Sequence, residues 1–99
     1  MKKRPENRLQ QDLKKKRKRI DLIDQKLLSL LNQRMRLALE IGKIKQELGQ
    51  GIYSPKREEE VLNKLMLRNK GPMQQGSLGK IYRTIMKMSR EAQRARFLC

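Results

Sequence analysis

Residues 20–48 read IDLIDQKLLSLLNQRMRLALEIGKIKQEL and repeat apolar side chains at the spacing of an α-helix. The repeat consists of Ile20, Ile23, Leu27, Leu30, Leu37, Ile41, Ile44 and Leu48. Arg34 occupies the position between Leu27 and Ile41, where another aliphatic side chain is expected. A guanidinium inside an apolar seam is costly unless an anion meets it. The pattern therefore predicts either a carboxylate of the protein or an anionic ligand beside Arg34.

The helix that carries this repeat is expected over about residues 6–48, ending before Gly49 and Pro55. A helix of ~40 residues is a rod of roughly 60 Å, whereas a compact chain of about 100 residues has a radius of gyration near 13 Å. The rod would extend beyond its own domain and leave its apolar stripe exposed. We therefore expect an intertwined helical dimer, and Ala38 and Gly42, one turn apart, permit close approach by another helix.

Two shorter helices complete an all-α chain of three helices. The second is expected over about residues 55–69, with Ser54 as its N-cap and a proline at its first position. The third is expected over about residues 77–96. We expect a basic tail over residues 1–8 and a single helical domain over residues 9–96.

The formal charge of +16 over 99 residues attracts anions of every kind, from nucleic acid to a small polyanionic substrate. Residues 1–19 contribute ten Lys and Arg against two acidic residues. There is no His, and the lone Cys99 supports neither a disulfide framework nor a metal cluster, which favours a reducing compartment. The chain shows no membrane-spanning run and no secretory segment, so a cytoplasmic location is expected.

Each expected helix also places polar residues on a face that should be buried. Lys45 follows Arg34 by eleven residues and returns to nearly the same face of the first helix, so the two cations can bracket a small dianion. Glu58 lies in register with the apolar residues of the second helix, and Ser89 and Gln93 lie one turn apart on the third. Together they predict a polar pocket within a helical bundle.

Each of these residues also has a structural interpretation. Arg34 can pair with Glu58 as a salt bridge, and Lys45 can extend its charge to solvent from the edge of a core. Glu58 also suits the positive start of a helix, Ser89 is small enough for packing, and Gln93 can cap a polar helix end. Only the combination favours a ligand site.

Arg17 precedes Arg34 by seventeen residues, roughly 25 Å along the axis and on a different face. It cannot join the Arg34–Lys45 site within one chain, but an antiparallel partner helix could deliver it there. Its position in the basic run of residues 14–19 is also typical of a solvated charge cluster.

The ordered set of motifs resembles the all-helical chorismate mutases over roughly residues 9–94. The matching segments are Ile20-Asp21-Leu22-Ile23-Asp24-Gln25-Lys26-Leu27-Leu28, Leu30-Leu31, Arg34, Leu37-Ala38, Ile41-Gly42-Lys43-Ile44-Lys45, Ile52-Tyr53-Ser54-Pro55-Lys56-Arg57-Glu58, Asn69-Lys70-Gly71-Pro72, Ile81-Tyr82-Arg83-Thr84-Ile85-Met86 and Ser89-Arg90-Glu91-Ala92-Gln93. The resemblance implies a domain-swapped homodimer whose two active sites are built from both chains. It implies conversion of chorismate, a small dianion, to prephenate on the route to phenylalanine and tyrosine, with no cofactor and no metal.

Carried over by position, the resemblance assigns a role to each polar residue. Arg34 and the partner chain's Arg17 resemble the arginines that grip the substrate carboxylates. Lys45 and Gln93 resemble the pair that hydrogen-bonds the ether oxygen, and Glu58 resembles the acceptor for the ring hydroxyl. Arg57 and Ser89 match further substrate-binding positions.

Ser54 departs from the family, which often has Asp at this position to help hold the ring hydroxyl. Serine keeps the N-cap function but loses a charge, so weaker hydroxyl recognition and weaker activity are expected. Lys16 also replaces the apolar residue that is usual before the matched Arg17.

Several other functions stay open at this stage. A related helical dimer cleaves isochorismate to pyruvate and salicylate, and a catalytically inactive or regulatory copy is compatible with Ser54. A basic module that binds nucleic acid or an acidic partner through residues 2–19 fits the charge. The scarcity of aromatic residues and the lack of a nucleic-acid-binding motif argue against nucleic acid, and no membrane partner is expected.

Overall fold

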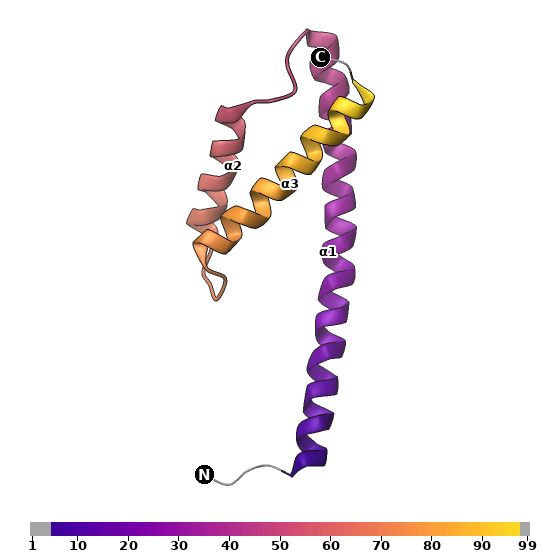
Figure 1. The fold of residues 1–99 in the computed structure, drawn as a ribbon, viewed down its shortest axis with the longest axis vertical. Coiled ribbons are helices and arrows are strands. Elements are labelled where there is room, and N and C mark those ends of the chain that lie inside the picture. The colour runs from indigo at the N-terminus through magenta and orange to yellow at the C-terminus, as the bar shows by residue number, and fades with distance from the viewer. Residues whose placement is uncertain (1–4, 98–99) are drawn as a thin grey trace. The chain divides into compact units, whose positions relative to one another are not determined.

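The computed structural model describes residues 5–97, which form three helices and no strand (Figure 1). Their bounds are α1 (Glu6–Leu48), α2 (Pro55–Arg68) and α3 (Gln75–Arg96). The predicted all-α class with one long and two shorter helices is confirmed. Part of the expected basic tail and Cys99 lie outside the described residues, and α1 already includes residues 6–8 of that tail.

The chain divides into two units between Arg34 and Met35. In the first unit, the described residues form the N-terminal part of α1, and none of them is buried. Its large apolar side chains are all exposed in the single chain, namely Leu9, Leu13, Ile20, Leu22, Ile23, Leu27, Leu28, Leu30 and Leu31. A helix of this kind buries no core of its own, so its stability must come from packing against another surface.

The second unit contains the rest of α1 together with α2 and α3. α1 ends where the sequence predicts, because Gly49 adopts the left-handed conformation with φ of 68° that favours glycine. Ser54 caps α2 as predicted, with its Oγ accepting a hydrogen bond of 3.3 Å from the backbone N–H of Arg57. Both boundaries follow from local chemistry that the sequence displays.

Side-chain amides hold the turn between α2 and α3. Asn69 Nδ2 donates to the carbonyl oxygen of Met73 and to Gln75 Oε1, each at 2.8 Å. Gln75 Nε2 donates in turn to the carbonyl oxygen of Met66 at 2.8 Å. α3 therefore starts at Gln75, two residues before the expected start at residue 77.

The C-terminal end of α3 packs against α1 at Ala38 and Gly42 (Figure 1). A Cβ atom at Gly42 would lie 2.8 Å from the Phe97 ring and 3.0 Å from Gln93 Cγ, which is too close for any side chain. The predicted close approach at these two small residues is confirmed, and the approaching helix is α3 of the same chain.

Candidate functional site

Lys45 is held by the chain segment that leads into α2. Its Nζ donates a hydrogen bond of 2.9 Å to the carbonyl oxygen of Ile52, and the contact is partly buried. Ile52 itself is only 5% exposed, so the carbonyl group that accepts the bond belongs to a buried residue. An ammonium carries three N–H donors, so two remain for a ligand. Lys45 is thus half-buried, and one of its three N–H groups is used in the bond to Ile52.

Gln93 and Ser89 lie on the buried face of α3, as the sequence predicts. Gln93 is 6% exposed, and its Nε2 donates a hydrogen bond of 2.6 Å to the carbonyl oxygen of Ala38 on α1. Ser89 is 8% exposed, and its Oγ donates to the carbonyl oxygen of Ile85 at 3.1 Å. The Gln93 carboxamide is thereby oriented, with its second N–H and its oxygen still available to a ligand.

Glu58 is bound by Arg90. The guanidinium Nη1 of Arg90 donates to both carboxylate oxygens, and the two side chains are 22% and 23% exposed. The Arg90 guanidinium also lies over the ring of Tyr53, 4.8 Å from its centroid. Glu58 therefore forms an ion pair with an arginine of α3. The structural interpretation of the sequence instead pairs Glu58 with Arg34.

Arg57 and Ser54 lie at the start of α2, beside Glu58 in sequence. The Arg57 side chain is exposed and approaches Glu60 Oε2 at 3.7 Å, a surface ion pair of small energetic value. Ser54 is half-buried and its hydroxyl oxygen serves as the helix cap. The structure thus gives Ser54 a structural role and leaves Arg57 at the surface.

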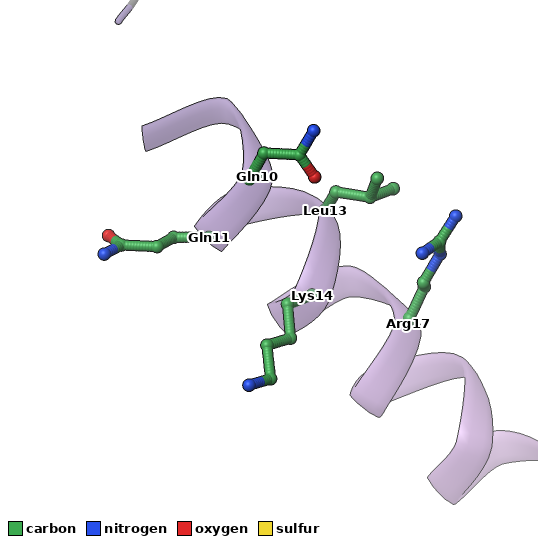
Figure 2. A pocket seen from close by; sticks show the side chains of 5 residues that line it. All are labelled: Gln10, Gln11, Leu13, Lys14 and Arg17. Atoms are coloured by element: carbon green, nitrogen blue, oxygen red, sulfur yellow. The ribbon is translucent and has the colours of Figure 1, made fainter. Parts of the chain in front are cut away.

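Arg34 and Arg17 belong to the first unit. Arg34 is half-buried on α1, whereas Arg17 is exposed. Arg17 lines an open depression of about 350 Å³ along the helix, together with Gln10, Gln11, Leu13 and Lys14 (Figure 2). Gln10, Leu13 and Arg17 project from one side of the helix in this view, so Arg17 shares a side with an apolar residue.

Sequence reasoning assigned no role to Arg90 or Tyr53, although both residues were part of the matched motifs. Arg90 follows Ser89 directly and precedes Gln93 by three residues, which places it near their face of the helix. Its pairing with Glu58 depends on how α2 and α3 pack. A single sequence does not display that packing, because Arg90 is one of four arginines in α3.

No helix within residues 5–97 is long and apolar enough to cross a membrane. In the same range, no group of three or more His, Cys, Asp or Glu side chains is placed to hold a metal ion.

The fold and the site define a class of all-helical protein in which an oriented lysine and a buried carboxamide are built into a small helical unit. The chain belongs to the chorismate mutase type II family, whose model matches residues 16–94. The resemblance seen in the sequence is thereby confirmed, and so is the three-helix fold.

Solved chorismate mutases share this structure. Form II of the enzyme from Thermus thermophilus superposes with a TM-score of 0.84 at 36% identity, covering 87% of this chain and 98% of that one. The Helicobacter pylori chorismate mutase, solved in complex with prephenate, gives a TM-score of 0.78 at 38% identity, covering 84% of this chain and 90% of that one.

A longer relative is the bifunctional chorismate mutase/prephenate dehydratase of Pseudomonas aeruginosa, which is 42% identical over 82 residues. The match covers 78% of this chain and 22% of the relative. The chain thus spans about a fifth of the bifunctional protein and nearly the full length of the solved chorismate mutases.

Proposed function

We propose that this chain is a chorismate mutase that rearranges chorismate to prephenate within a homodimer. The observation that carries the proposal is its similarity to the Helicobacter pylori protein solved with prephenate, which extends over 90% of that chain. The similarity to two solved structures of chorismate mutase from Thermus thermophilus, which extends over 98% of each of those chains, supports the same activity.

The reaction is a pericyclic shift in which a carbon–oxygen bond breaks while a carbon–carbon bond forms. It requires no nucleophile and no proton transfer from the protein. The protein has two tasks: to hold the substrate side chain over the ring, and to stabilise negative charge that grows on the ether oxygen. The lack of His therefore does not oppose this activity.

Lys45 and Gln93 are suited to the second task. Each side chain is already oriented by a bond to a backbone carbonyl, at Ile52 and Ala38 respectively. Each keeps a free N–H donor, and donors fixed before the reaction need no reorganisation as charge develops. In this proposal both donate to the ether oxygen, one as a cation and the other as a neutral amide.

The remaining residues bind the rest of the substrate. Arg34 and the partner chain's Arg17 bind the two carboxylates, because paired charge-assisted bonds suit a dianion. Glu58 accepts a hydrogen bond from the ring hydroxyl. Arg57 and Ser89 complete the site, with a weaker contribution from Ser54.

The exposed apolar stripe of α1 supports the homodimer. Its residues are 49–63% exposed in the single chain, and they are Ile20, Ile23, Leu27, Leu30, Leu37, Ile41, Ile44 and Leu48. An exposed apolar stripe of this length, interrupted by Arg34, marks an interaction site, and a second copy supplies a complementary stripe. The same pairing would bring Arg17 of one chain to Arg34 of the other. We further propose a cytoplasmic location, with chorismate as the small-molecule partner and no nucleic acid.

Incubation of the purified chain with chorismate, and separately with isochorismate, tests the activity. Loss of chorismate absorbance with prephenate as the identified product is the expected result. Pyruvate and salicylate from isochorismate would show a lyase of the same fold instead. Turnover of neither substrate, together with binding to an acidic polymer at physiological salt, would overturn the proposal and favour the basic binding module.

A further inference from the structure

Arg90 joins two residues on either side of the cap of α2. Its guanidinium binds the carboxylate of Glu58 through both oxygens and stacks over the Tyr53 ring. With Ser54 as the N-cap, Tyr53 is the residue before the cap and Glu58 is the fourth residue of the helix. These two positions often hold an apolar contact that fixes how the chain enters a helix. In this protein an arginine from α3 connects them instead.

The same segment holds Lys45. The carbonyl that accepts the Lys45 hydrogen bond belongs to Ile52, the residue directly before Tyr53. A guanidinium over Tyr53 therefore restrains the backbone next to this carbonyl. Arg90 is less than a quarter exposed, so its contacts are less screened by water than those of the surface pair Arg57–Glu60.

Arg90 also compensates the charge of Glu58. An ionised carboxylate in the site of a dianionic substrate repels that substrate unless a cation lies beside it. A carboxylate has about four acceptor positions, so Glu58 can bind Arg90 and still accept a hydrogen bond from a substrate hydroxyl. The pair thus presents an oriented acceptor without a net negative charge.

We infer that Arg90 is a positioning residue, which fixes Glu58 for recognition of the ring hydroxyl and steadies the Ile52 carbonyl that holds Lys45. The inference rests on the proposed function, because it assigns the hydroxyl of chorismate to Glu58. It adds a specificity role to a residue that touches no reacting atom.

The test compares Arg90→Ala with Arg94→Ala, which removes the same charge from an exposed position one turn further along α3. The values of kcat and KM are measured for chorismate and for an analogue in which hydrogen replaces the ring hydroxyl. Arg90→Ala should lower kcat/KM for chorismate about tenfold, mainly through KM, with a smaller loss for the analogue. Arg94→Ala should leave both values and the preference between the two substrates unchanged.

Two further variants separate positioning from general stability. Adding Arg90→Ala to Glu58→Gln should cost little beyond Glu58→Gln alone, because residues that act as a unit are not additive. Arg90→Lys retains the charge without the planar fork and should restore part of the preference for chorismate. Far-UV circular dichroism reports folding, and if Arg90→Ala does not fold, Arg90→Lys against the wild type decides the question.

Three results would overturn the inference. Equal losses on both substrates with an additive double variant would reduce Arg90 to a structural residue. An Arg90→Ala variant indistinguishable from Arg94→Ala would remove any role for it. Wild-type chain that does not convert chorismate would overturn the proposed function, and with it the role given to Arg90.

Discussion

Residues 5–34 and residues 35–97 both expose large apolar side chains, but they differ in whether they also bury some. The first region exposes every large apolar residue it has and buries none. The second region buries Ile52 and Met86, and it also buries two polar side chains, Ser89 and Gln93. Within the described residues, only the second region therefore forms a core from its own helices, and in the proposed homodimer the exposed apolar stripe of α1, which runs through both regions, faces a second chain. The following predictions test that division.

The largest effect on activity is expected for Arg34 and Lys45, two charged residues of α1 that lie on either side of the boundary between the two regions. Arg34→Ala and Lys45→Ala should each lower kcat about a hundredfold or more, because in the proposed function each removes a charge that binds the substrate or stabilises the reacting atoms. Lys43→Ala, at an exposed position on the same helix, is the matched control and should keep normal activity. Chorismate absorbance measures the rate, and near-normal turnover in Arg34→Ala or Lys45→Ala would reject their assigned roles.

Gln93 gives a test within the second region, where the buried carboxamide is neutral at every working pH. Gln93→Glu should make activity depend on pH, because only a protonated carboxyl can donate a hydrogen bond to the ether oxygen. Activity of the variant should therefore fall as pH rises and the carboxyl ionises, while the wild type shows no such fall from this residue. A pH–rate profile of kcat compares the two, and parallel profiles would contradict the role of Gln93 as donor.

A mixing experiment tests whether the first region completes the site of a partner. Arg17→Ala and Arg34→Ala chains, each inactive alone, are unfolded together and refolded as a mixture. If the site is shared, half of a random mixture is heterodimer with one intact site of two, so about a quarter of normal activity should return. Recovery no greater than that of either variant refolded alone would argue against a site shared between the two chains.

Leu27→Lys tests whether the apolar stripe of α1 is the dimer interface. Burial of a leucine contributes roughly 1.5–3 kcal/mol, so a lysine at this position should weaken the dimer by about 2 kcal/mol or more. Gln25→Lys adds the same charge at an exposed position outside the repeat and should leave association unchanged. Sedimentation equilibrium measures both dissociation constants, and equal values for the two variants would argue against the stripe as the dimer interface.

The smallest effect is expected at the cap of α2. Ser54→Ala removes the acceptor for the Arg57 backbone N–H and should lower the free energy of unfolding by about 1 kcal/mol. Ser54→Asp retains an oxygen acceptor at the cap and should keep the stability of the wild type. Thermal unfolding at matched protein concentration compares the variants, and an unchanged Tm in Ser54→Ala would show that the cap contributes little.

The fold could be predicted from the sequence because its signals are local. Each signal depends on residues only a few positions apart in the chain. The signals are the apolar repeat of residues 20–48, the helix start at Ser54-Pro55 and the helix end at Gly49. The sequence predicts the start of α3 two residues late, because Gln75 takes its position from bonds to Asn69 and Met66 rather than from a cap residue.

The site could be predicted only in part. Burial of Ser89 and Gln93 follows from helical periodicity, and their burial is confirmed. The carbonyl that holds Lys45, by contrast, is a backbone group, and every residue has one, so sequence pattern gives no sign of it. The partner of Glu58 depends on the packing of α2 against α3, and among many arginines the sequence does not single out Arg90.

Gly42 links the size of one residue to the orientation of a side chain on another helix. An added methyl group would lie 2.8 Å from the Phe97 ring and 3.0 Å from Gln93 Cγ, so these two side chains would have to shift. A shift of Gln93 would disturb the hydrogen bond from its Nε2 to the Ala38 carbonyl oxygen, which orients the carboxamide. The missing side chain at Gly42 thus leaves room for the Gln93 carboxamide to keep its orientation.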